Sequence, residues 1–350
     1  MSKPVQSESR LRAYWHFLLA VLYFFMARSL AHHAAQGLVN QELSPLVEQM
    51  MLVFLLLLGY ATMGFWFNGQ RHPVRQQGLP ARAGWTGEAG LGLLFGWGLA
   101  VVCVLPLMLF GGIAIVLYTQ SSSWGWLFAD AAFFALVALA EEVAFRGYGF
   151  QRFVNAVGPL GAALGFAAYY AIVQSFQPGA NHASLAVSLV LSLLLSAAYL
   201  RTRALWVSWG INFGWKASRA LLFGLTISGV NVHSPVVQGD PMGNFWMTGG
   251  GYGLDGSWMV FYILLAALPV LFHLTRNLNF HYNAPVLIPG GIPVDLDAAA
   301  RAQHEAAMGA AAPAEPSLIQ ILPVQTVPAP VTPPSATPGD TPAGSEHAAH

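Results

Sequence analysis

Charged side chains inside long apolar runs are the residues of this sequence that could do chemistry. Glu141 and Glu142 stand side by side in one such run, and Arg146 follows Glu142 by four residues. Lys216 and Arg219 lie in a later apolar run. An ionisable group in apolar surroundings is costly unless it is paired, and in a membrane it is a functional candidate by default. We therefore start from these five residues.

Two adjacent buried carboxylates allow two interpretations. In a metal-assisted hydrolase, Glu141 would act as general base on a water molecule while Glu142 holds a metal or orients Arg146. In the alternative, the charges form an ion-pair network that only fixes helix packing, since Arg146 at i+4 shares a helix face with Glu142. The chemistry alone leaves both interpretations open.

The elements that must position these residues are membrane helices. Of 350 residues, 55% are hydrophobic and 9% are charged, with a mean hydropathy of +0.54, whereas a soluble domain carries roughly 25% charged residues. Apolar runs near the ~20 residues needed to cross a bilayer occur at 15–26 and onward past Arg28, 46–67, 91–118, 126–153, 160–176, 185–200, 205–225 and 258–274. The predicted fold class is an all-α polytopic membrane bundle of about eight transmembrane helices. A straight fourth helix would place Glu141 ~16 Å from Arg152, near mid-membrane.

Lys and Arg are distributed asymmetrically between the loops of this bundle. They occur before the first run, at 71–82, and at 152, 201, 203 and 276, whereas the segments 119–125, 177–184 and 226–257 contain none. Such residues favour the cytoplasmic side, so both termini are expected in the cytoplasm, and a bacterial plasma (inner) membrane is the expected location. The first run has a second interpretation as a secretory signal, because Arg10 and Arg12 precede it. The net charge of +0 argues against nucleic acid as a partner and leaves membrane lipids.

The chain divides into three parts by composition. Residues 1–14 form a cytoplasmic N-terminal segment, residues 15–283 the transmembrane bundle, and residues 284–350 a Pro/Ala-rich tail that is expected to be disordered. Within the bundle, the four-residue spacing of Gly92 and Gly96, and of Gly161 and Gly165, predicts close helix contacts. The Gly-rich segment 239–256 is interpreted as a linker, with a lid as the alternative.

The segment EEVAFRG at 141–147 matches the E-E-x-x-x-R-G signature of the CPBP intramembrane proteases, which include CAAX prenyl endopeptidases and bacteriocin-processing enzymes. Three further segments resemble this family in the same order: YAIVQSFQP at 170–178, AAYLRTRALW at 197–206 and GINFGWKASRALLFG at 210–224. The resemblance covers about 128–229. It implies a Glu-dependent intramembrane metalloendopeptidase in which Glu141, Glu142 and Arg146 are catalytic, with zinc as cofactor and a membrane or prenylated peptide as substrate or partner.

The sequence departs from this family where the family places its nitrogen ligands. Gln174 and Asn212 stand at the two histidine positions and Lys216 at the following asparagine. In a second register of the fifth run, Phe166 takes the aromatic position and Tyr170 the histidine position, which also supplies no imidazole. His32, His33, His182 and His273 lie at the ends of runs or in loops and are poor replacements. Zinc prefers imidazole and thiolate to carboxamide, so whether a metal binds is unknown and its affinity is expected to be weak.

Three functions follow from these residues. The first is a CPBP-type endopeptidase in which Gln174 and Asn212 bind an oxyanion or a weak metal. The second is a catalytically inactive member that acts as a membrane scaffold or peptide-binding regulator, with the Lys216 ammonium replacing the charge of the metal beside Glu141 and Glu142. A transporter using Glu141, Glu142, Lys216 and Arg219 as an ion pathway is a distant third.

Overall fold

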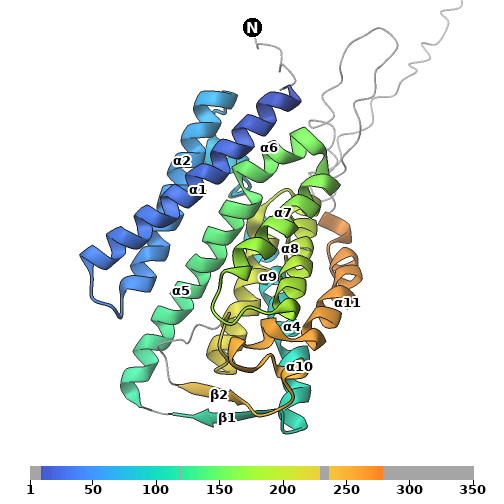
Figure 1. Ribbon diagram of the computed structural model, residues 1–350. Helices are drawn as coiled ribbons and strands as arrows, with labels where there is room; N and C mark the ends of the chain where they lie inside the picture. Colours follow the sequence, from blue (N-terminus) through green and yellow to red (C-terminus); the bar gives the residue numbers. More distant parts are fainter. Residues whose placement is uncertain (1–8, 119, 229–235, 279–350) are drawn as a thin grey trace, which may run out of the picture.

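The chain folds as a bundle of helices, with one small pair of strands at its base (Figure 1). The computed structural model describes residues 9–118, 120–228 and 236–278. The predicted 284–350 tail lies outside the described residues. The helices are α1 (Arg10–Leu38), α2 (Ser44–Asn68), α3 (Pro73–Gln76), α4 (Trp85–Leu109), α5 (Ser121–Arg146), α6 (Tyr148–Val157), α7 (Pro159–Ser175), α8 (His182–Thr202), α9 (Leu205–Ala217), α10 (Phe245–Thr248) and α11 (Trp258–Leu274).

The predicted all-α membrane bundle is confirmed at this level. Among the described residues, four helices are long and apolar enough to cross a membrane, namely α1, α2, α4 and α8, and α11 is a shorter apolar helix. Each of the eight apolar runs contains at least one helix of the bundle, and the fourth contains parts of two, α5 and α6. The number of eight spans stays a prediction, because α5, α7 and α9 are not among the four.

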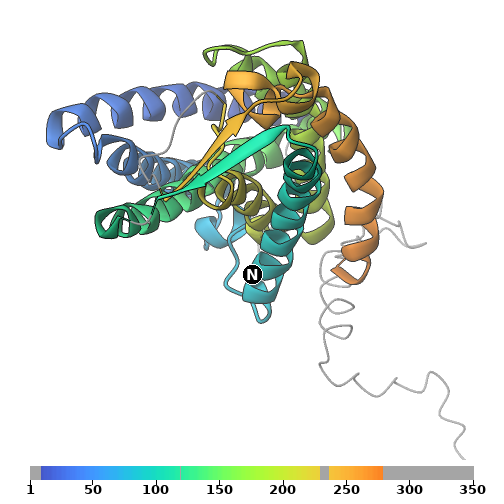
Figure 2. The same ribbon diagram turned by 90° about the horizontal axis from the view of Figure 1, so that it is seen from below.

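Two of the predicted runs end earlier than expected. In the run 91–118, helix α4 ends at Leu109. Residues Ile113–Leu117 form strand β1, which pairs antiparallel with β2 (Val237–Pro241). Seen from below, this pair crosses the end of the bundle (Figure 2). The Gly-rich segment 239–256 begins within β2. Most of its remaining residues lie in α10 and in two short 3₁₀ helices, Gly250–Tyr252 and Leu254–Gly256. The segment therefore has regular structure and is not a plain linker.

The fourth run also breaks, at Gly147. Its φ and ψ are −78° and −136°, and a β-carbon there would lie 2.3 Å from the Val143 carbonyl oxygen, so no larger residue fits without a shift. The helix therefore stops at Arg146 and restarts as α6, which carries Arg152 in a new direction (Figure 1). The prediction of one straight helix through 126–153, from which the depth of Glu141 was calculated, is therefore wrong.

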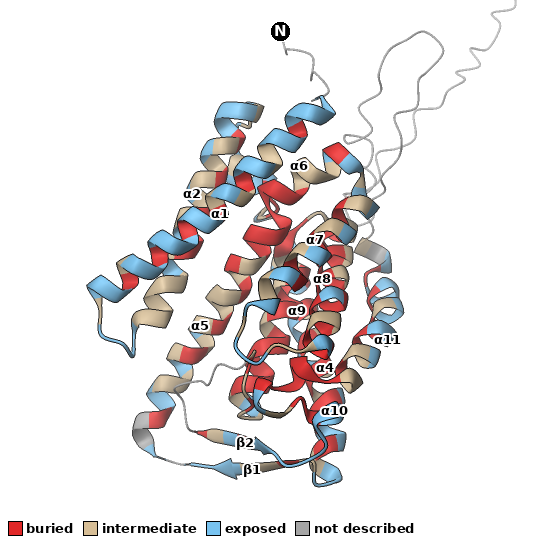
Figure 3. Cartoon of the chain, viewed as in Figure 1, coloured by how far each residue is buried: buried red, intermediate tan, exposed pale blue. Residues whose placement is uncertain are grey.

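The buried residues concentrate around α5, α8 and α9, while α1 and α2 lie at one side with an exposed outer face (Figure 3). Capping residues fix the start of α8: Asn181 Oδ1 accepts from the Ser184 backbone N–H at 2.9 Å, and Ser184 Oγ accepts from the Asn181 N–H at 2.8 Å. The central helices α5, α8 and α9 bring residues together around one cluster of polar side chains, with contacts between residues 46 and 71 positions apart in the sequence.

The predicted contact through Gly92 and Gly96 is confirmed, since both face α9. A β-carbon on Gly96 would lie 2.3 Å from the Ile211 carbonyl oxygen, and one on Gly214 of α9 would lie 2.5 Å from the Leu93 carbonyl oxygen. The two backbones are therefore in direct contact. Gly161 and Gly165 instead face side chains of α6, Val157 and Phe153.

Candidate functional site

The polar centre of the bundle is built by α5 and α9. Glu141, Glu142 and Arg146 occupy the last turns of α5, and Asn212 and Lys216 lie one helical turn apart on α9. Glu142, Arg146 and Asn212 are fully buried and Lys216 is 6% exposed. The structure thus brings five of the six predicted site residues into one hydrogen-bonded cluster.

Each carboxylate is held by cationic or amide donors. Lys216 Nζ lies 2.5 Å from Glu141 Oε1, and Asn212 Nδ2 donates to Glu141 Oε2 at 2.9 Å and to Glu142 Oε1 at 3.2 Å. Arg146 donates from one guanidinium nitrogen to Glu142 Oε1 at 3.0 Å. Two carboxylates beside two cations give a cluster that is neutral overall, which is the condition for burying four charges.

Arg146 is held from a third helix by Ser192 of α8. Its second terminal nitrogen donates to Ser192 Oγ at 3.0 Å and to the Ser192 carbonyl oxygen at 3.3 Å. Sequence reasoning missed this residue, although the serines at 184, 188, 192 and 196 recur every four residues and mark one polar face of an otherwise apolar helix. This four-residue spacing of serines could have predicted a polar contact made by α8.

Gln174, the sixth predicted residue, lies apart from the cluster. Its Nε2 donates to the Tyr170 hydroxyl at 2.9 Å on the same helix, α7. Gln174 and Glu141 nevertheless border the same cavity of about 280 Å³, which lies between α1, α2, α5 and α7. The charged and carboxamide side chains around this cavity are Arg28, Glu48, Gln49, Glu141, Gln174 and Gln177, and Tyr170 also lines it. Glu141 is the member of the charge cluster that reaches this cavity, since its side chain is 19% exposed.

Arg219 forms a second buried charge cluster close to the first. It lies in the π-helical turn Ser218–Leu222 that continues α9, stacks 3.9 Å over the Trp215 ring and approaches Asp255 at 2.8 Å. Asp255 comes from the Gly-rich segment, and no local pattern in the sequence predicts that it pairs with Arg219. A π-helical turn in a helix often marks a functional site, and here it connects the segment 249–257 to the helix that carries Lys216.

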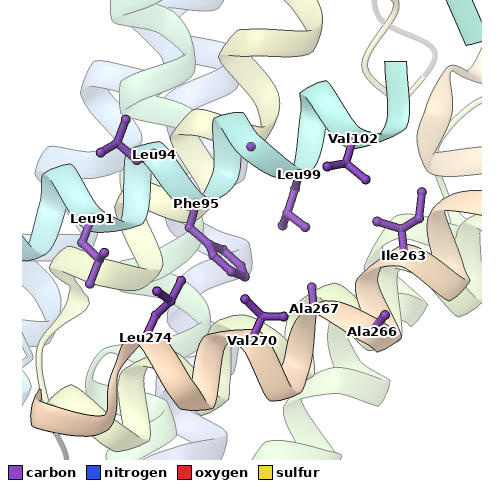
Figure 4. Close-up of a pocket in the computed structure, with 11 residues that line it drawn as sticks. Leu91, Leu94, Phe95, Leu99, Val102, Ile263, Ala266, Ala267, Val270 and Leu274 are labelled. Atoms are coloured by element: carbon purple, nitrogen blue, oxygen red, sulfur yellow. The ribbon is translucent and has the colours of Figure 1, made fainter. Parts of the chain in front are cut away.

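A larger cavity, of about 590 Å³, lies between α4 and α11 (Figure 4). All eleven residues that line it are apolar or glycine, including Phe95, Val102 and Ile263. Such a lining offers hydrocarbon contacts and no group for acid, base or metal chemistry, so the candidate site remains the pocket beside Glu141.

The residues present do not fit a zinc ion. In the described ranges, no group of three or more His, Cys, Asp or Glu side chains is placed to hold a metal. Both oxygens of Glu141 already accept from Lys216 and Asn212, and the ammonium of Lys216 would repel a second cation. Zinc sites are built from imidazole, thiolate and carboxylate, whereas the groups facing Glu141 and Glu142 here are an amide, an ammonium and a guanidinium.

We expect Lys216→Ala to lower the free energy of unfolding by about 2 kcal/mol, because it leaves the carboxylate of Glu141 without its cation. Breaking a fully buried pair costs ~3–5 kcal/mol. The expected loss is smaller here because Glu141 is partly exposed. Adding Glu141→Gln should recover most of the loss. Thermal unfolding in detergent measures both, with Arg276→Ala, which removes an exposed cation, as control. An unchanged melting temperature for Lys216→Ala would mean that the pair does not stabilise the bundle.

Comparison with known proteins identifies the fold family of this site. Residues 121–218 match the family model of the Type II CAAX prenyl endopeptidase Rce1-like proteins. No curated protein and no solved structure matches the chain. The matched range contains α5 to α9 and all six predicted site residues. Residues 121–218 of this integral membrane protein are therefore similar to the Type II CAAX prenyl endopeptidase Rce1-like proteins, in agreement with the CPBP resemblance of its motifs.

Proposed function

We propose that this protein is a CPBP-family member in which the Lys216 ammonium takes the place of a metal, and that the pocket beside Glu141 binds a polypeptide segment in the membrane. The contact between Lys216 Nζ and Glu141 Oε1 carries the proposal. A cation held at this carboxylate offsets its charge and lowers its basicity, which disfavours its use as the base of a zinc-bound water. The protein would then act as a membrane scaffold or peptide-binding regulator.

The lining of the pocket supports a polypeptide ligand. Carboxamides at Gln49, Gln174 and Gln177 line it together with apolar and aromatic side chains. A carboxamide both donates and accepts hydrogen bonds, which matches the N–H and C=O groups of a peptide backbone. Apolar side chains of the ligand would lie against Phe24, Phe133 and Phe145.

Peptide-bond hydrolysis is the second candidate, as the family suggests. One observation favours it: Glu141 borders the pocket, whereas Glu142 is fully buried. In this function Glu141 would activate water, and the Asn212 amide and Lys216 would stabilise the oxyanion without a metal. Hydrolysis requires Lys216 to leave Glu141 in the reacting state.

Elemental analysis of the purified protein, together with cleavage of a prenylated reporter peptide, tests both candidates. We expect no stoichiometric zinc and no cleavage in the natural chain. A variant with Gln174→His, Asn212→His and Lys216→Asn should bind about one zinc per chain, since it supplies two imidazoles beside Glu141 and removes the competing ammonium. The matched control carries Asn212→His and Lys216→Asn together with Gln177→His, and it keeps Gln174. This control should bind much less zinc.

Two results would contradict the proposal. Stoichiometric zinc in the natural chain that is lost in Glu141→Gln would establish a metal site and make a metalloprotease the better assignment. Cleavage by the natural chain without zinc, lost in Glu141→Gln, would establish metal-free hydrolysis instead.

The expected orientation is also part of this proposal: both termini in the cytoplasm of a bacterial plasma membrane. The connections 39–43, 110–120, 176–181 and 223–257 contain no Lys or Arg, whereas 69–84 contains Arg71, Arg75 and Arg82, which supports it.

A further inference from the structure

The cavity between α4 and α11 is walled by hydrocarbon alone, since all its lining residues are apolar or glycine. Small residues keep it open on both helices. A β-carbon added at Gly98 of α4 would meet no atom within 4 Å, and Ala266 of α11 is exposed. The side chains of Leu94, Val102 and Val270 that border the cavity are also exposed (Figure 4). The cavity is therefore a groove that opens at the outer surface of the bundle, where a membrane protein meets lipid.

The groove has the length of one lipid leaflet. Along α4 it extends from Leu91 to Val102, which is ~16 Å at 1.5 Å per residue. The hydrocarbon core of a bilayer is ~30 Å thick, so one leaflet is ~15 Å deep. A single acyl chain therefore matches the groove in length and in polarity. An extended peptide would bring backbone N–H and C=O groups that this lining leaves without partners.

One end of the groove carries cationic side chains. Leu91 and Leu274 lie together at this end (Figure 4). Arg276 follows Leu274 by two residues, so the two Cα atoms are within ~7 Å of each other, and Arg276 is exposed. Arg201 of α8 lies 4.7 Å over the Phe272 ring of α11 and donates to the Phe272 carbonyl oxygen at 3.1 Å. Two guanidinium groups are thus held around the end of α11.

The carboxylate nearest to this end along α4 already has a partner. Glu88, three residues before Leu91, is buried and lies 2.5 Å from a guanidinium nitrogen of Arg82. In the part of the chain that the structure describes, no carboxylate lies within 4 Å of Arg201 or Arg276. A guanidinium binds phosphate through its fork of N–H donors. The end of the groove therefore suits an anionic head group at the membrane surface.

We propose that the groove between α4 and α11 binds one anionic phospholipid, with an acyl chain along the groove and the phosphate beside Arg276 and Arg201. The site is separate from the pocket beside Glu141, so this inference does not depend on the proposed peptide-binding function. A bound lipid would fill the outer side of α4, whose inner side contacts α9 through Gly96. Its binding should therefore stabilise the helix pair behind the charge cluster.

Native mass spectrometry of the full chain, released from vesicles of equimolar phosphatidylglycerol and phosphatidylcholine, tests this site. We expect the natural chain to retain a single phospholipid, with phosphatidylglycerol preferred. Gly98→Leu and Ala266→Leu each place a side chain in the groove and should abolish retention. Gly90→Leu is the matched control, because it adds the same side chain to α4 outside the groove, also with nothing within 4 Å of its β-carbon, and it should keep the lipid. Arg276→Gln should lower the preference for phosphatidylglycerol about fivefold, the contribution of one arginine near a membrane surface.

A second measurement uses the melting temperature in detergent. Added phosphatidylglycerol should raise it for the natural chain and for Gly90→Leu, and should leave it unchanged for Gly98→Leu and Ala266→Leu. The same scans show whether each variant folds. If Gly98→Leu does not fold, Ala266→Leu, at an exposed position of the facing helix, carries the test.

Three results would overturn the proposal. Retention of phosphatidylglycerol at the natural level by the folded groove variants would place the lipid elsewhere on the protein. Equal retention of the two lipids by the natural chain would remove the anionic head group from the assignment. A lipid-free dimer that Gly98→Leu converts to a monomer would show that a second copy of the chain covers the groove.

Discussion

Gly96→Ala will lower the free energy of unfolding by about 3 kcal/mol, the upper end of the range for overpacking. The new methyl group would lie 2.3 Å from the Ile211 carbonyl oxygen and 2.7 Å from the Trp215 nitrogen. Both neighbours are backbone atoms of α9, which cannot rotate away as a flexible side chain would. The only relief is to move α4 and α9 apart, and α9 carries Asn212 and Lys216.

Thermal and chemical unfolding in detergent measure this effect. Gly98→Ala is the matched control, because it adds the same methyl group to the same helix at a position with nothing within 4 Å. Gly214→Ala, which makes the reciprocal contact from α9 with the Leu93 carbonyl oxygen, should be destabilising in the same way. Equal stability of Gly96→Ala and Gly98→Ala would show that the two backbones are not in contact.

The second large effect is expected for Arg146→Met, which should lower the free energy of unfolding by about 3–5 kcal/mol. Both Arg146 and Glu142 are fully buried, so the substitution leaves a buried carboxylate without its cation. It also leaves the Ser192 hydroxyl without the guanidinium that it accepts from.

A double-mutant cycle separates the lost ion pair from the lost packing. Glu142→Gln in the Arg146→Met background removes the unpaired charge, and we expect it to recover more than half of the loss. Arg75→Met, at an exposed position in α3, controls for the removal of a cation. If the double variant were no more stable than Arg146→Met, packing of the guanidinium rather than its charge would hold α5 against α8.

The sequence by itself determined the class of fold and the composition of the site. Apolar runs separated by polar segments identify membrane helices because each must bury its backbone groups internally. The i+4 spacing of Glu142 and Arg146 predicts their ion pair, since a helix places these residues on one face. The four-residue spacing of Gly92 and Gly96 predicts a close helix contact, although it does not say with which helix. Each of these signals is local, so the order of residues is sufficient to read it.

Only the tertiary structure decided which distant groups meet. The pairing of Lys216 with Glu141, the donation from Arg146 to Ser192 and the approach of Asp255 to Arg219 join different segments, and no local period encodes them. The break at Gly147 also depends on packing, because a glycine within an apolar run is compatible with a continuing helix. The placement of Arg28 at the cavity beside Glu141 follows from how α1 and α2 lie against α5 and α7, which hydropathy cannot specify, since apolar surfaces attract without direction.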